Sequence, residues 1–216
     1  MFKRSTRGAD IIGSTGGPTS IFFCGKKKLT FWQRLQKKRF ELRKKRMEKH
    51  ITDANHTIEE VCEYIKVHHG FTQVNCESEE YRETYVQMRA SFLIEHAPKL
   101  LGEYAKVPEI ESRDEIGIKK FMEQIELRQR AAEAVSQNCF DIDLSMYKKE
   151  TVGAQMCLTV EKKYGYIGGS MGGDKKSRKQ FDKVERDVYR YYGVTKEDIE
   201  KRTKRYDMLL EELAHR

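Results

Sequence analysis

The side chains most able to do chemistry are a dense group of cations between Lys26 and Lys49. Lysine and arginine at this density can neutralise phosphates, while the interleaved aromatic residues Phe31, Trp32 and Phe40 can stack on exposed bases. The same pattern suits a helix lying on an anionic membrane, or a solvated helix with one apolar seam against the protein body. The residues predicted to bind an anionic partner, nucleic acid or a membrane surface, are Lys26, Lys27, Lys28, Trp32, Arg34, Lys37, Lys38, Arg39, Arg43, Lys44, Lys45 and Arg46.

Charge is distributed unevenly along the chain. Residues 1–50 hold 15 lysines and arginines and three acidic residues, a net charge of +12. Residues 51–216 hold 27 basic and 31 acidic residues, a net charge of −4. The overall charge of +8 therefore belongs to the first quarter of the sequence, which predicts a basic arm on a mildly acidic body.

The glycine-rich stretch over residues 165–174, GYIGGSMGGD, is a second candidate anion site. Backbone N–H groups of such a loop at a helix N-terminus can cradle an anion. A phosphate-binding P-loop requires G-x-x-x-x-G-K-[ST]; Gly168 and Gly173 have this spacing, but Asp174 occupies the lysine position. We interpret the stretch as a strand-to-helix connection. Its weak anion-binding candidates are Gly168, Gly169, Gly172, Gly173 and Lys175.

The sequence shows no pattern typical of catalysis or of a metal site. Asp141 and Asp143 would share one side of a strand, but that side is opposite the apolar one and is expected to face solvent. The adjacent His68 and His69 would diverge on a helix rather than converge on one metal. The five cysteines are odd in number and form no C-x-x-C pair, which favours free thiols in a reducing cytosol. We predict no catalytic residue, metal ligand or cofactor.

One short motif, IIGSTGGPTSIFF over residues 11–23, resembles the glycine-rich intramembrane motif GIIGGADGPTSIF of the β subunit of sodium ion-translocating decarboxylases. The matching residues are Ile11, Ile12, Gly13, Gly17, Pro18, Thr19, Ser20, Ile21 and Phe22. That family couples carboxybiotin decarboxylation to sodium export and uses the aspartate of the motif for ion handling. Gly16 stands at the aspartate position, and no stretch approaches the ~20 apolar residues of a membrane-spanning helix. The resemblance therefore implies a fragment or accessory component of such an assembly that does not pump.

These candidates are carried by a chain whose patterns predict a mostly helical α+β fold. Tyr81, Tyr85, Met88 and Phe92 recur at helical spacing, which predicts a helix over residues 78–97. Because four large side chains in one stripe must be buried, we expect the rest of the chain to pack around this helix.

Further helix boundaries are indicated by capping residues. The pattern Ser/Thr-x-x-Glu/Asp begins at Thr57, Ser112 and Thr195, and each match precedes apolar residues at helical spacing. Gly70 and Gly193 stand where helix ends need a left-handed residue.

A basic helix is predicted over residues 31–50. Thr30 is its expected N-cap, and Trp32, Leu35 and Leu42 form its expected apolar seam.

Strands are predicted by alternating apolar residues on both sides of Gly153. This pattern indicates a β-hairpin near residues 139–163, and residues 71–74 could add a third short strand. The expected organisation is a glycine-rich irregular segment over 1–28, a basic helix or arm over 29–54, and a helical α+β domain with the hairpin over 55–216.

From these features we expect a non-enzymatic cytosolic interaction protein, soluble or peripheral to a membrane, that presents its basic arm to an anionic partner. The alternative, implied by the resemblance, is an accessory component that contacts membrane decarboxylase subunits. A third alternative is an anion- or nucleotide-binding enzyme that uses the glycine-rich stretch.

Overall fold

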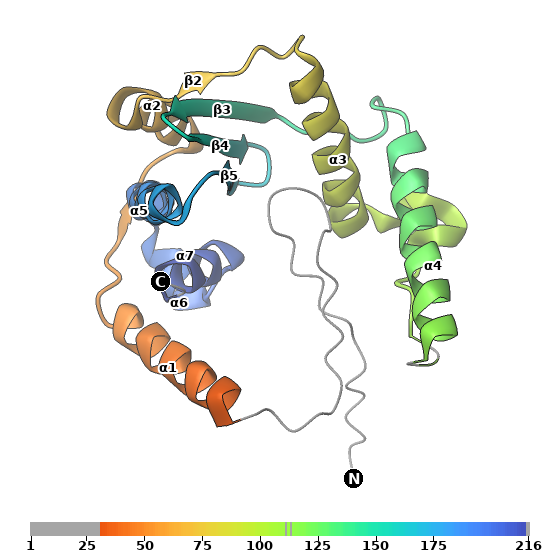
Figure 1. The fold of residues 1–216 in the computed structure, drawn as a ribbon, viewed down its shortest axis with the longest axis horizontal. Helices are drawn as coiled ribbons and strands as arrows, with labels where there is room; N and C mark the ends of the chain where they lie inside the picture. Colours follow the sequence, from red (N-terminus) through yellow and green to blue (C-terminus); the bar gives the residue numbers. More distant parts are fainter. Residues whose placement is uncertain (1–30, 111, 113, 215–216) are drawn as a thin grey trace. The chain divides into compact units, whose positions relative to one another are not determined.

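The computed structural model describes residues 31–110, 112 and 114–214 (Figure 1). The fold class predicted from the sequence is confirmed, because the structure is mostly helical and contains a small antiparallel sheet. By their internal contacts the described residues divide into two compact units. We call residues 75–143 the helical unit, and residues 31–74 with 144–214 the sheet unit. The chain leaves the sheet unit after residue 74 and returns to it at residue 144.

The sheet unit is built on four antiparallel strands in the order β2-β3-β4-β5. Their bounds are Thr72–Gln73 for β2, Leu144–Thr151 for β3, Ala154–Glu161 for β4 and Tyr166–Gly172 for β5. The predicted hairpin is confirmed as β3 and β4, in which Thr151 faces Ala154 and Gly153 turns the chain with φ of +77°. The predicted third strand is confirmed as β2, which pairs with β3.

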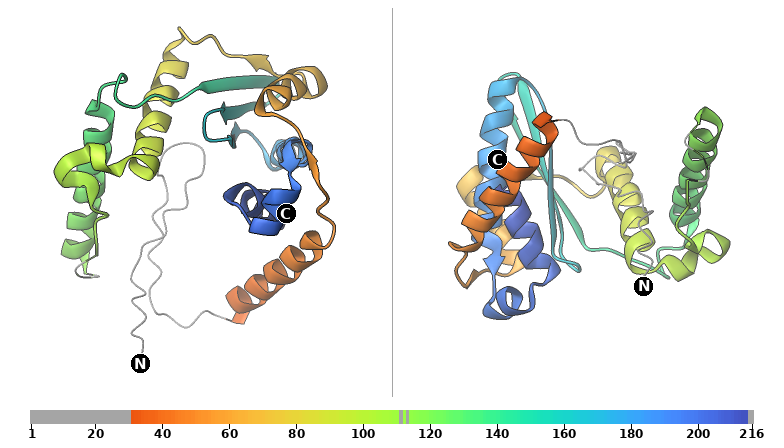
Figure 2. Two further views of the ribbon diagram at one scale, coloured as in Figure 1. Left: turned by 180° about the vertical axis from the view of Figure 1, so that it is seen from behind. Right: turned by 90° about the horizontal axis from the view of Figure 1, so that it is seen from below.

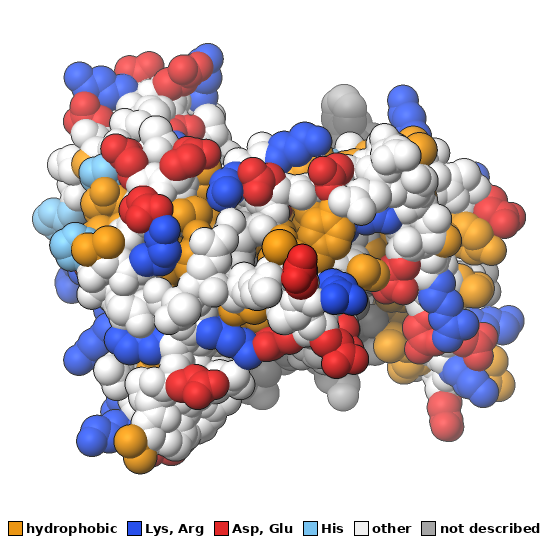
Figure 3. Space-filling view, turned by 90° about the horizontal axis from the view of Figure 1, so that it is seen from above, with side chains coloured by type: hydrophobic (Ala, Val, Ile, Leu, Met, Phe, Trp, Pro, Cys, Tyr) orange, Lys and Arg blue, Asp and Glu red, His pale blue; other side chains and the backbone are white. Residues whose placement is uncertain are grey.

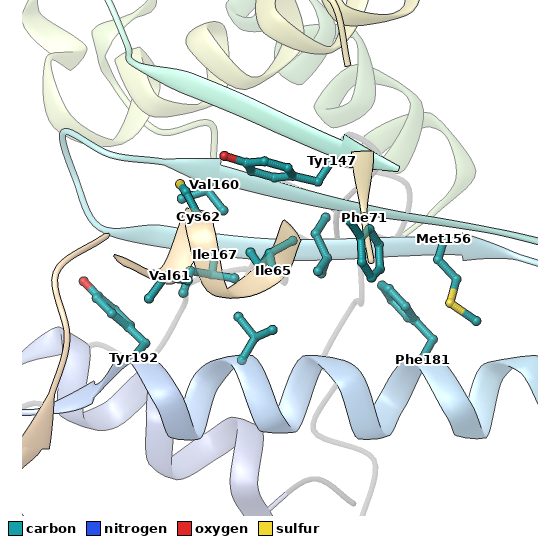
Figure 4. Packing of buried hydrophobic residues seen from close by; sticks show 12 residues of the cluster. Val61, Cys62, Ile65, Phe71, Tyr147, Met156, Val160, Ile167, Phe181 and Tyr192 are labelled. Atoms are coloured by element: carbon teal, nitrogen blue, oxygen red, sulfur yellow. The ribbon is translucent and has the colours of Figure 1, made fainter. Parts of the chain in front are cut away.

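Two helices lie side by side against this sheet and close its core (Figure 4). They are α2, Ile58–His69, and α5, Lys175–Tyr192. The core consists of Val61, Cys62, Ile65, Phe71, Tyr147, Met156, Leu158, Val160, Ile167, Phe181, Val188 and Tyr192. No residue of the helix predicted over 78–97 belongs to this cluster. The expectation that the whole chain packs around that helix is therefore wrong.

A second buried cluster of the sheet unit joins α1, Phe31–Glu48, to α7, Lys204–Ala214 (Figure 2). Tyr206, Leu209 and Leu210 of α7 are buried, and Met47 of α1 packs against them. Between α5 and α7 the chain forms β6, Gly193–Val194, and α6, Lys196–Lys201. β6 pairs with β1, Ala54–Asn55, so the chain that follows α1 is tied to the end of α5.

The helical unit consists of α3, Glu79–His96, the 3-10 helix η1, Pro98–Ala105, and α4, Glu115–Ala134. The predicted helix over 78–97 exists and is N-capped by Ser78, and its buried face is shifted from the expected one toward Arg89 and Ala90. Arg89, Ala90, Phe92 and Leu93 are buried, whereas the other three residues of the predicted stripe are only half-buried. Arg89 is buried, and its guanidinium donates hydrogen bonds to the backbone carbonyls of Val135, the C-cap of α4, and of Phe140 in the segment that follows.

The capping patterns gave mixed results. Both side-chain hydrogen bonds of a capping box are present at Thr57 and at Thr195, and Gly70 ends α2 in the left-handed conformation. The start predicted at Ser112 is wrong, because α4 begins after Asp114, whose carboxylate accepts from the N–H of Gly117.

Candidate anion-binding surfaces

The anchored side of α1 fixes the orientation of this helix in the sheet unit. Lys44 Nζ lies 3.5 Å from a carboxylate oxygen of Glu211 on α7. Arg202 donates a hydrogen bond to Glu48, and Met47 is inserted into the α7 cluster. With one side held in this way, the opposite side of α1 faces outward.

The outward side of α1 combines cations with large apolar side chains. Trp32 is 70% exposed and Leu42 is 67% exposed, so these two residues of the expected apolar seam do not pack against the protein body, whereas Leu35 is half-buried. Residues 32, 39, 42 and 46 follow helical spacing and share one face with residues 38 and 45. We call this set the α1 cationic face, defined as Trp32, Lys38, Arg39, Leu42, Lys45 and Arg46.

The four cations of the α1 cationic face are exposed, and within the described part of the chain none of them forms an ion pair. Lys44, which the sequence also proposed for partner binding, instead anchors the helix through Glu211. The remaining predicted residues of α1, Arg34, Lys37 and Arg43, are exposed beside the face. Several predicted residues lie outside the described residues, and their roles stay predictions: Lys26, Lys27, Lys28, and the motif residues Gly13, Gly17, Pro18 and Thr19.

The glycine-rich stretch does not form the predicted strand-to-helix connection. Gly168 and Gly169 are paired with β4, and Gly172 ends β5. A Cβ on Gly169 would lie 2.6 Å from the Phe181 ring, so glycine is required here for the close approach of α5 to the sheet. These glycines therefore belong to a strand rather than to a loop at the helix N-terminus, and their role in anion binding stays a prediction.

The N-terminus of α5 is already occupied by its own cap. The Asp174 carboxylate accepts from the N–H of Ser177 at 2.7 Å, and this hydrogen bond holds the pKa of Asp174 below its ordinary value. Gly173 precedes this cap with φ of +150°, and Lys175 is exposed in the first turn. The residues that follow the P-loop-like spacing therefore form the capped start of α5.

A second cationic surface, on α5, was missed by the sequence analysis. Lys176, Lys179, Lys183, Arg186 and Arg190 recur at i, i+3, i+7, i+10 and i+14, which places them on one side of the helix. That side is opposite the one that buries residues 181 and 188 against the sheet. The spacing itself was a usable signal. Acidic residues at 182, 185 and 187 are interleaved with these cations in the sequence and obscure their spacing.

An open hollow of about 380 Å³ lies where this α5 surface meets the end of α2. It is lined by His69, Gln180, Lys183, Val184, Arg186, Asp187 and Arg190. In the space-filling view from above, histidine and hydrophobic side chains gather on the side where α2 lies (Figure 3). The hollow thus brings three cations of one helix next to an imidazole of another.

Asp187 is the one carboxylate among the residues that line this hollow, and it is engaged by α2. Its Oδ2 accepts a hydrogen bond from the Tyr64 hydroxyl at 2.7 Å and lies 3.2 Å from Nε2 of His69. The hydrogen bond raises the pKa of Tyr64 to about 12. Burial lowers the pKa of His69 although the Asp187 carboxylate acts in the opposite direction.

Aromatic rings stabilise the α2–α5 contact beside the hollow. The Tyr64 ring stacks on Tyr191 with centroids 3.9 Å apart, and His56 stacks on the other side of Tyr191 at 3.8 Å. His68 stacks on Tyr64 at 4.5 Å. This ladder of four rings holds the two helices in register and so fixes the walls of the hollow.

Comparisons with family models, curated proteins and solved structures found no match. None of the described helices is both long and apolar enough to cross a membrane. In the same residues, no group of three or more His, Cys, Asp and Glu side chains is arranged to hold a metal ion.

Proposed function

We propose that this chain is a non-enzymatic interaction protein of the cytosol that binds an anionic partner, nucleic acid or a membrane surface, through the α1 cationic face. One observation carries the proposal: Trp32 and Leu42 are exposed on the same side of α1 as four cations that form no ion pair with a described residue. Exposed large apolar groups among cations are the arrangement that both kinds of partner require.

The opposite side of α1 supports this role. Because the ion pair to Glu211 and the packing of Met47 anchor the helix, the cationic face is presented by a fixed scaffold and needs little ordering when a partner binds. On a membrane, Trp32 and Leu42 would enter the interface while lysine and arginine reach the headgroups. On nucleic acid, the cations would neutralise phosphates and Trp32 would stack on a base.

The two partners can be separated with one intrinsic probe, since Trp32 is the only tryptophan of the chain. We expect its emission to shift to the blue with vesicles containing phosphatidylserine if the partner is a membrane. Stacking on a base would instead quench it with a single-stranded oligonucleotide. Neutral phosphatidylcholine vesicles serve as the reference for purely apolar binding.

Two variants of equal net charge test whether the face is responsible. The first replaces its four cations: Lys38→Gln, Arg39→Gln, Lys45→Gln and Arg46→Gln. The matched control removes four exposed lysines of the helical unit: Lys99→Gln, Lys106→Gln, Lys119→Gln and Lys120→Gln. The proposal requires the first variant alone to lose binding. Equal losses in both variants, or no binding by the unaltered chain to either partner, would overturn it.

A further inference from the structure

The hollow between α2 and α5 carries an inference that is independent of the α1 cationic face. Two buried nitrogen atoms in its wall, Nε2 of His69 and Nε of Arg186, have no hydrogen-bond partner in the described protein. Nε2 of His69 lies near Asp187 but does not meet hydrogen-bond geometry. Buried polar nitrogens are hydrogen-bonded in most proteins, so this part of the wall is less well satisfied than usual. Because both atoms are buried, a ligand in the hollow would meet the exposed cations rather than these nitrogens.

Positive charge surrounds these two nitrogens. Lys183, Arg186 and Arg190 line the hollow from successive turns of α5, and none of them forms an ion pair within the described chain. Arg186 is half-buried, whereas Lys183 and Arg190 are exposed. A guanidinium presents a planar set of N–H donors that matches the oxygens of a phosphate group.

The carboxylate of Asp187 is the feature that opposes anion binding here. Its Oδ2 is turned toward α2, where it accepts from Tyr64 and lies beside His69. Three cations therefore face one carboxylate that is already engaged, and the local balance remains positive.

We propose that this hollow binds the phosphate group of a small phosphorylated molecule, with Lys183, Arg186 and Arg190 holding the phosphate oxygens while His69 stays beside Asp187 in the wall. The volume of about 380 Å³ lies at the lower end of the range for small-molecule sites. It leaves room for a compact organic group besides the phosphate. Val184 and the amide of Gln180 line the same wall and supply an apolar and a polar contact for that group.

Titration of the full chain with inorganic phosphate and with phenyl phosphate, followed by calorimetry, tests the proposal. We expect both probes to bind, phenyl phosphate more tightly. Arg186→Gln is expected to weaken binding at least tenfold. Lys179→Gln removes one charge from the same side of α5 outside the hollow, and we expect it to change affinity less than twofold. Asp187→Asn should tighten binding, a gain that a misfolded variant cannot imitate.

The nitrogen resonance of His69 Nε2 supplies a readout that a merely structural role of Arg186 would not move. Phenyl phosphate should shift this resonance in the unaltered chain and in Lys179→Gln. Absence of heat and of any shift with both probes would overturn the proposal. Binding of inorganic phosphate but not of phenyl phosphate would refute the proposal that the ligand is a phosphorylated organic molecule. If neither phosphate probe binds and Arg186→Gln weakens the binding of an oligonucleotide whereas Lys179→Gln does not, the hollow belongs to a nucleic-acid backbone, and the proposal is likewise overturned.

Discussion

Replacement of Gly193 by alanine is expected to break the junction that ties α1 and α7 to the end of α5. Gly193 has φ of +57° and ψ of −160°, a combination that side chains other than glycine hardly tolerate. A Cβ at this position would lie 1.6 Å from the carbonyl oxygen of Ala54 on the paired strand β1. Because that neighbour is backbone, the clash can be relieved only if β1 and β6 separate.

The magnitude follows from the contacts at this junction. An unfavourable backbone conformation costs about 1–3 kcal/mol. Separation of β1 from β6 also moves the Gly193 carbonyl, which accepts from Nε of Arg205 at 2.9 Å, and each lost hydrogen bond costs about 1 kcal/mol. We therefore expect Gly193→Ala to lower the free energy of unfolding by about 3 kcal/mol or more.

Urea denaturation followed by circular dichroism measures this loss, and hydrogen exchange at residues 54–56 locates it. Gly172→Ala is the matched control. Gly172 is not in the left-handed region, and a Cβ there would have no atom within 4 Å; we expect a change within about 0.5 kcal/mol. The reasoning would be refuted if Gly193→Ala lost less than about 1 kcal/mol, or lost no more than the control.

Three further predictions concern the packing of both units. Burial lowers the pKa of His69 below its ordinary value of 6.5, so below pH 7 the unfolded chain binds more protons than the folded one. Stability should therefore fall as the pH is lowered from 7 to 5, and His69→Gln should make this fall smaller, as urea midpoints will show. Arg89→Met should cost about 3 kcal/mol in the helical unit, because the half-buried carbonyl of Val135 and the buried carbonyl of Phe140 lose their donor. Leu158→Ala should lower the free energy of unfolding by about 2–5 kcal/mol in thermal or urea unfolding, since Leu158 is fully buried. A loss below about 1 kcal/mol, as expected for an exposed residue, would contradict the assignment of Leu158 to the core.

Structural features that are determined by neighbouring residues in the sequence could be predicted. The caps at Thr57, Thr195 and Gly70 and the turn at Gly153 depend on side chains and backbone angles nearby, and all four occur where the pattern indicated. The hairpin was predictable for the same reason, because alternation and a glycine turn are local signals.

Features set by a distant neighbour could not be predicted. Gly169 is a strand residue because Phe181 of α5 approaches it, and its own stretch of sequence does not contain that partner. The buried Arg89 of α3 likewise donates to carbonyls some 50 positions later.

The candidate surfaces show the same limit. The cations of α1 were predictable, but the orientation of Trp32 was not, because Met47 and Glu211 decide which side faces inward. The hollow depends on contacts of α5 with His69 of α2, residues more than 100 positions apart in the sequence.

The affinity of the full chain for anionic vesicles and for oligonucleotides, measured against salt concentration, tests the central claim most directly. On a membrane each cation contributes about 1 kcal/mol, so loss of the four cations of the α1 cationic face should weaken vesicle binding about 10³-fold. On duplex DNA the slope of log affinity against log salt should become shallower by about 3 to 4. Unchanged affinity and slope for both partners in the fourfold variant would contradict the account.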